Sequence, residues 1–193
     1  IYMYFSPFVL RTDTGDPVPV DIHIAEETDL LATQCDPVWQ TDWTSDYLSA
    51  PSIEKYAVKT ADQELIALAA YQVRGHSAYV YILYVESAPH SNPTMNSREA
   101  RRYYGIGELL IAYGIKYSID HGCRGDVVFD AKTDELAAKV LDDMAKEAPE
   151  EIRGQLLDNL HWIRQAAENQ MVVGSQARIL YADSEGRIRI ALA

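Results

Sequence analysis

The chain has few cysteines, few basic residues and no long apolar run, and each shortage excludes a class of protein. Its 193 residues include only two cysteines, Cys35 and Cys123, far apart and without the spacing of a metal site or disulfide framework. We therefore expect reduced thiols and a cytoplasmic location. Lysine and arginine number 17 against 29 acidic residues, a formal net charge of −12. Since nucleic-acid binding needs a basic face, no nucleic-acid partner is expected.

Several motifs are also missing. No apolar stretch approaches the length of about 18 residues that spans a bilayer, so we expect no membrane partner. The opening IYMYFSPFVL lacks a basic leader and a small-residue cleavage site, unlike a signal peptide. The Gly-x-Ser-x-Gly, His-Glu-x-x-His and Cys-x-x-Cys patterns do not occur, and no acidic cluster has ligand spacing. We therefore predict no metal.

Hydrophobic residues make up 48% of the chain, which is enough for one domain with a sizeable core. The acidity fits plain solubility, and it also fits a cationic small molecule such as an amine or polyamine. The composition leaves both interpretations open.

Strand and helix patterns alternate along the chain. Residues 1–17 read as an N-terminal extension, and residues 18–193 as one α/β domain with an extra helical insertion at about 147–172. We expect strands at 18–24, 54–60, 64–73, 78–85 and 126–132. We expect helices at 26–35, from Thr41 or Ser45 to Leu48, at 106–121 and at 134–147. An extra helix at 149–169 and a hairpin of 177–182 with 187–192 complete the prediction.

The most informative segment is Arg102-Tyr103-Tyr104-Gly105-Ile106-Gly107, because a helix is predicted to begin within it. A helix N-terminus carries free N–H groups and a partial positive charge, and glycines let the main chain approach a ligand. The segment therefore predicts a phosphate or pyrophosphate cradle. The small or apolar residues that follow have helical spacing: Ile106, Leu109, Leu110, Tyr113, Gly114 and Tyr117.

Arg-x-x-Gly-x-Gly between a strand and an amphipathic helix resembles the acetyl-CoA loop of the GNAT N-acetyltransferase superfamily. The order of elements over about residues 18–145 is similar as well. The resemblance implies a GNAT acyl-CoA N-acyltransferase fold, with a mixed twisted sheet of about six to seven strands. It also implies acetyl-CoA as cosubstrate, an amine acceptor and a homodimer as one assembly. Binding residues would be Val85, Arg102, Tyr103, Tyr104, Gly105, Ile106 and Gly107, with the Val85 N–H polarising the acetyl carbonyl.

Glu86 ends the strand that precedes this loop, where the resemblance places a catalytic base. A solvent-exposed glutamate at a strand end is the simpler interpretation. His90 is a second candidate, because imidazole titrates near neutrality. Trp39, Asp42, Trp43 and Tyr47 have the composition of an acceptor pocket for a cationic amine, and they fit an ordinary core equally well.

The chain departs from the family pattern in two places. Val140 stands where a tyrosine would protonate the leaving thiolate, so Tyr104, Tyr181 or water would have to replace it. The loop of residues 87–101 is longer than in the family, which leaves the register of the contacts open. Two alternatives to direct acetyl transfer in a ternary complex follow: a CoA-binding regulator without transfer, and an interaction module that uses the extra helix.

Overall fold

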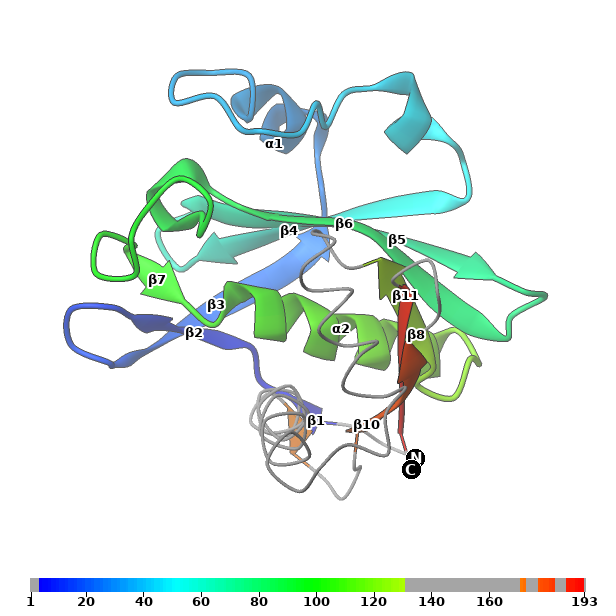
Figure 1. The fold of residues 1–193 in the computed structure, drawn as a ribbon. Helices are drawn as coiled ribbons and strands as arrows, with labels where there is room; N and C mark the ends of the chain where they lie inside the picture. Colours follow the sequence, from blue (N-terminus) through cyan, green and yellow to red (C-terminus); the bar gives the residue numbers. More distant parts are fainter. Residues whose placement is uncertain (1–3, 131–170, 173–176, 183–186, 193) are drawn as a thin grey trace. The chain divides into compact units, whose positions relative to one another are not determined.

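The structure is a computed structural model, and it describes residues 4–130, 171–172, 177–182 and 187–192. The chain divides into two compact units, and Figure 1 labels the helices and strands that make them up. The first comprises Ile1–Phe5, Val73–Leu83 and Ile111–Ala193, and the second comprises Ser6–Gln72 and Tyr84–Leu110. The residues of the predicted acetyl-CoA loop all belong to the second unit, so this unit is the one that bears on the site.

The second unit is built on an antiparallel ladder. Its strand order is β5-β4-β3-β2-β7. The strands are β2 (Phe8–Arg11), β3 (Pro17–Ile24), β4 (Ile53–Thr60), β5 (Leu65–Arg74) and β7 (Tyr103–Tyr104). The tight turn between β4 and β5 has Gln63 at φ 66° and an N–H of Gln63 that donates to the Thr60 carbonyl at 2.9 Å. This turn explains the hairpin that the sequence predicts.

Short helices join these strands. They are α1 (Glu27–Ala32) and the 3₁₀ turns η1 (Asp46–Ser49) and η2 (Pro89–Ser91). A capping box between Glu26 and Asp29 begins α1. At the other end the Thr33 hydroxyl donates to the Leu30 carbonyl at 2.6 Å. The helix therefore ends three residues before the position that the sequence predicts, Cys35, because a local side-chain bond replaces the next turn.

The first unit contains a parallel strand pair. In it, β6 (Tyr79–Ser87) pairs with β8 (Val127–Asp130) from Val80–Val127 to Ile82–Phe129. Next to β8 lie β11 (Arg187–Leu192) and then β10 (Ala177–Ala182), both antiparallel. The short strands β1 (Tyr4–Phe5) and β9 (Met171–Val172) form a separate pair. The described pairs between β6 and β8 run to Ile82–Phe129, close to the end of the described part of β8 at Asp130, and β6 itself runs on to Ser87.

Helix α2 (Ile106–Asp120) is buried on more than one side. Its predicted apolar face is buried at Leu109, Leu110 and Tyr117, but Ile115 and Ser118 on other faces are fully buried too. The Ser118 hydroxyl satisfies its buried position by donating to the Asp126 carbonyl at 2.8 Å. The side chains of the second unit with almost no exposed surface include Val9, Trp43, Leu48, Val58, Ile66, Leu68 and Tyr71.

The α/β class and the mixed twisted sheet are confirmed, with elements in the predicted order through β8. The hairpin of β10 and β11 has the predicted bounds. Strands β2 and β7 were not predicted, and β2 lies within the segment expected to be an extension. The predicted helices at 134–147 and 149–169 lie outside the described residues, so the insertion at about 147–172 and the domain boundaries stay predictions.

A buried ion pair ties α1 to the sheet. The Asp29 carboxylate is 2.6 Å from Lys59 Nζ on β4 and accepts the Glu26 N–H at 3.0 Å. Burial alone raises the pKa of Asp29, but the hydrogen bond from Lys59, helped by Glu26 and His23, outweighs it and leaves the pKa below its usual value. This stabilisation is therefore present above the ordinary carboxyl pKa of 3.8 and is lost as the pH falls through the lower folded-state value.

We predict that Asp29→Asn lowers the free energy of unfolding at neutral pH by about 2 kcal/mol, because Lys59 loses its charged partner. Urea unfolding should show the gap to wild type shrinking as the pH falls below about 4, since Asp29 is protonated first in the unfolded state and, at lower pH, in the folded state as well. Asp21→Asn is the control, because Asp21 is mostly exposed and should matter little. A gap that stays constant down to pH 2 would contradict the linkage.

Candidate functional site

Glu86 is buried and holds a neighbouring loop through both of its carboxylate oxygens. Its exposed fraction is 4%. The Gln40 N–H donates to Oε1 at 2.6 Å, while the Thr41 N–H donates to Oε2 at 3.1 Å. The Trp43 indole N–H also donates to Oε2, at 2.8 Å. A buried carboxylate needs such partners, so Glu86 fixes the segment of residues 40–43 over the end of β6.

This contact changes how the predicted residues divide. Trp43 is fully buried and Trp39 is 8% exposed, so both belong to the core and not to the wall of a pocket. The interpretation of Glu86 as an exposed strand-end glutamate is wrong, because its carboxylate is enclosed by donors from the chain. Its role as a base stays a prediction.

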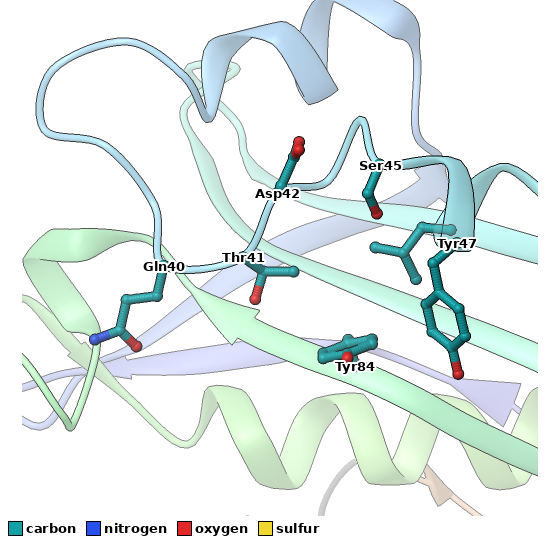
Figure 2. Close-up of a pocket in the computed structure, with 7 residues that line it drawn as sticks. Gln40, Thr41, Asp42, Ser45, Tyr47 and Tyr84 are labelled. Atoms are coloured by element: carbon teal, nitrogen blue, oxygen red, sulfur yellow. The ribbon is translucent and has the colours of Figure 1, made fainter.

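A shallow pocket of about 390 Å³ lies beside the same loop. It is lined by Gln40, Thr41, Asp42, Ser45, Tyr47, Leu48 and Tyr84 (Figure 2). The exposed rings of Tyr47 and Tyr84 meet edge to face, with centroids 6.3 Å apart. Figure 2 shows the Asp42 carboxylate pointing away from Tyr84. Hydrogen bonds from Thr44 hold the pKa of that carboxyl below its usual value, so Asp42 adds negative charge at the rim.

The predicted acetyl-CoA loop has the backbone that its glycines allow. Gly105 has φ +85° and directly precedes α2, a conformation that side-chain-bearing residues rarely adopt. No atom lies within 4 Å of the position that a Cβ would take at Gly105 or at Gly107. The main chain at the start of this 15-residue helix is therefore open to close approach.

The five amide groups from Tyr103 to Gly107 are not equivalent. The Tyr103 N–H donates to the Ser91 hydroxyl at 3.0 Å. Tyr104 pairs with Leu10, and since the Thr12 N–H donates to the Arg102 carbonyl, Leu10–Tyr104 is the next hydrogen-bonded pair of the ladder. Among the described residues nothing accepts the N–H groups of Gly105, Ile106 or Gly107, and the first turn of a helix supplies no acceptor. That these three amides bind an anion stays a prediction.

Charged side chains surround this cradle unevenly. The Arg102 guanidinium is turned to Glu64, with Nη1 2.5 Å from Oε1, so it is engaged elsewhere. Arg101 instead has a buried Nε without a partner in the described structure and acts electrostatically on Glu108 in the first turn of α2. Burial raises the pKa of Glu108, against a bond to its own backbone and the charge of Arg101. A less ionised Glu108 repels an incoming anion less.

His90 and Ser91, on η2, are joined to the strand that leads into the cradle. The His90 Nδ1 lies 2.7 Å from the Ser91 hydroxyl, and the Arg102 N–H donates to the His90 carbonyl at 2.9 Å. The His90 Nε2 is 2.9 Å from Glu64. Burial and the nearby Arg102 lower the pKa of His90, while Glu64 opposes the shift.

The long loop between β6 and α2 also reaches the segment that Glu86 holds. The Gln40 amide oxygen accepts hydrogen bonds from Asn92 at 3.3 Å and from the Thr94 hydroxyl at 2.9 Å. Asn92 is 2% exposed, and its own oxygen accepts the Thr94 N–H. The long loop is therefore anchored by hydrogen bonds on both of its sides.

The structure thus brings Glu86, Gln40 and the pocket together, and separately brings His90, Ser91 and Tyr103 together. Val85 lies in β6 beyond the last described pair with β8. Ser91 and Arg101 were missed by sequence reasoning, because neither residue type signals a site by itself. Val140 lies outside the described residues. Among the residues that are described, no three His, Cys, Asp or Glu side chains gather as metal ligands, and no helix is long and apolar enough to cross a membrane.

Comparison by sequence finds a likeness to urocanate hydratases over part of the chain. Residues 123–193 match the family model of the urocanase C-terminal domain. Over 70 residues the chain is 50% identical to urocanate hydratase of Homo sapiens, which is 36% of this chain and 10% of that protein. The probable urocanate hydratase of Dictyostelium discoideum is 43% identical over 63 residues. The chain thus spans about a tenth of the length of the curated relatives it matches.

Comparison by structure finds acetyltransferases. Spermidine/spermine N-acetyltransferase SpeG from Vibrio cholerae has a TM-score of 0.43 at 12% identity, covering 90% of this chain and 92% of that one. Nourseothricin acetyltransferase has a TM-score of 0.35 at 12% identity, covering 98% of this chain and 83% of that one. Similarity at this level does not establish a shared activity.

We predict that Glu86→Gln lowers the free energy of unfolding by about 2–3 kcal/mol. The introduced amide NH2 would face N–H donors that need an acceptor, which leaves buried groups unpaired. Guanidinium unfolding followed by tryptophan fluorescence measures the change, since Trp43 itself reports on the contact. Glu99→Gln is the control, because Glu99 is exposed in the long loop. Equal midpoints for the two variants would show that Glu86 does not hold the 40–43 segment.

Proposed function

We propose that the protein is an N-acetyltransferase that transfers the acetyl group of acetyl-CoA directly to a primary amine in a ternary complex. The observation that carries the proposal is the open glycine segment at the start of α2. Three amides without a recorded acceptor among the described residues, at Gly105, Ile106 and Gly107, and the unpartnered Nε of Arg101 suit a diphosphate. Arg102, Tyr103 and Tyr104 then support the loop, and they contact the ligand less than the sequence predicts.

The rest of the donor would follow β6. In this proposal an extended pantetheine arm binds the backbone of β6 near Val85, which follows the described pairs with β8 along the strand. The Val85 N–H is then the proposed donor to the acetyl carbonyl, where negative charge develops. Nitrogen attacks the carbonyl carbon, the C–S bond breaks, the amine proton passes to a base and the thiolate takes up a proton.

The acceptor amine would enter the pocket beside Tyr84. Exposed tyrosine rings attract cations, and Asp42 together with the net charge of −12 favours a protonated amine near the rim. Glu86, or a water ordered by it, is the proposed base. A homodimer and a cytoplasmic location, which the sequence also predicts, remain part of the proposal.

The first alternative is a CoA-binding regulator without transfer. The second is an interaction module that uses the extra helix, which lies outside the described residues. The match of residues 123–193 favours another candidate, the hydration of urocanate named for the relatives. We expect this chain to leave the near-ultraviolet absorbance of urocanate unchanged, because it covers a tenth of those proteins. A steady loss of that absorbance would replace the transferase assignment.

We predict that Gly107→Ala weakens CoA binding and that Gly107→Val weakens it by at least tenfold, since each added carbon fills the approach to the cradle. Gly107 has no positive φ and no neighbour within 4 Å of its missing Cβ, so both variants should fold. Calorimetric titration with acetyl-CoA and desulfo-CoA measures the affinity, and circular dichroism checks the fold. Unchanged affinity in the valine variant would remove the cradle.

We predict that acetyl-CoA releases thiol when an amine acceptor is added, and that Glu86→Gln lowers this rate by at least about a hundredfold if Glu86 is the base. Trp43→Phe is the matched variant, because it removes one donor to the carboxylate and keeps the carboxylate itself. Thiol release over a panel of amines measures both. Equal losses would assign Glu86 to positioning alone, and binding without release would favour the regulator.

A further inference from the structure

The Ser91 hydroxyl occupies a site where it can serve only one arrangement of hydrogen bonds. Ser91 is 2% exposed, so water does not reach it freely. Its oxygen accepts the Tyr103 N–H at 3.0 Å, and His90 Nδ1 lies 2.7 Å away. A hydroxyl has one hydrogen to donate, and the only nearby acceptor that these contacts record is the Nδ1 lone pair.

The other side of the imidazole fixes its tautomer. Glu64 Oε1 lies 2.9 Å from Nε2, although out of line for a hydrogen bond. A carboxylate oxygen this close to a bare nitrogen lone pair would be repelled, so the hydrogen belongs on Nε2. Nδ1 is then free to accept the Ser91 hydroxyl. The donors point one way: the Tyr103 N–H donates to Ser91, the Ser91 hydroxyl donates to His90, and the His90 Nε2–H faces the Glu64 carboxylate.

We propose that Ser91 is a positioning residue that holds the strand leading into the Gly105–Gly107 cradle, and that protonation of His90 releases this hold. The inference rests on the proposed function, since it regulates the same phosphate-binding loop. Tyr103 is two residues before Gly105, so the position of its backbone constrains the position of the Gly105, Ile106 and Gly107 amides. We call this contact the clasp: His90 and Ser91 of the long loop between β6 and α2 hold the Tyr103 backbone.

The release follows from hydrogen counting. A protonated His90 carries hydrogens on both nitrogens, so Nδ1 becomes a donor and the Ser91 hydroxyl hydrogen has no acceptor in a buried site. The charged groups that face the ring are Glu64 before β5 and Arg102 before β7, and the Tyr103 ring meets it at 5.9 Å. Arg102 opposes a second positive charge and Glu64 favours it, so the group titrates within an existing ion pair.

Hydrogen exchange of the Tyr103 amide tests the clasp without any ligand. We expect exchange in Ser91→Ala to be at least about tenfold faster than in wild type at neutral pH. Ser97→Ala, an exposed serine of the same loop, is the control and should leave the rate unchanged. Equal rates in wild type and Ser91→Ala overturn the positioning role, and a thermal midpoint for each variant verifies that it is folded.

His90→Asn tests the proton, because an asparagine oxygen can accept the Ser91 hydroxyl but does not titrate. Between pH 7.5 and 5, we expect Tyr103 protection in wild type to fall at least about fivefold more than in His90→Asn. Intrinsic exchange rates cancel in this comparison. The same pH response in both proteins overturns the role of His90.

Titration with CoA then links the clasp to the cradle. We expect Ser91→Ala to bind CoA about tenfold more weakly than wild type, and wild type to lose more affinity on acidification than His90→Asn, in which titration of the ligand phosphates is the same. Equal affinities overturn the link. If wild type binds no CoA while Tyr103 exchange still responds to Ser91 and His90, the proposed function fails and the clasp stands.

Discussion

The arrangement of the second unit depends on one buried carboxylate. Glu86 lies on β6 and is buried, so its charged carboxylate needs hydrogen-bond partners. It accepts hydrogen bonds from Gln40, Thr41 and Trp43. The donors come from an irregular segment with no strand to pair with, so this contact decides where the segment lies. The pocket beside Tyr84 exists because the segment is held there. Glu86, which the sequence predicts as a catalytic base, therefore has a structural role in holding residues 40–43.

Side-chain hydrogen bonds also fix the loop that precedes α2. A long connection would ordinarily be mobile, but Asn92 and Thr94 bind Gln40 on one side while His90 and Ser91 bind residues 102–103 on the other. The polar residues that suggest flexibility in the sequence are those that fix the loop. The pocket beside Tyr84 and the strand before Gly105 are consequently linked through the hydrogen bonds of one loop, which would give a physical route between the two proposed binding sites.

Local patterns in the sequence predicted much of the fold. The glycines at 105 and 107 mark the start of α2, and the alternation in residues 187–192 gives β11 its bounds. Strands β2 and β7 were missed because a two-residue strand such as β7 has no periodicity, and the segment around β2 is rich in proline and glycine. The burial of Glu86 was unpredictable because its donors lie more than forty positions away. The match of residues 123–193 to the urocanase C-terminal domain rests on the identity of individual residues, which periodicity does not reveal.

Strand β8 belongs by sequence to the urocanase-like part and by hydrogen bonding to β6, which lies outside that part. Removing the chain from residue 123 onward would bare one side of Val80–Ile82 in an apolar, aromatic strand. Unprotected edges of that kind recruit other chains, so the shortened polypeptide would tend toward self-association. Residues 127–130 therefore complete the unit that also contains Val73–Leu83, and cutting the chain at residue 123 would divide that unit.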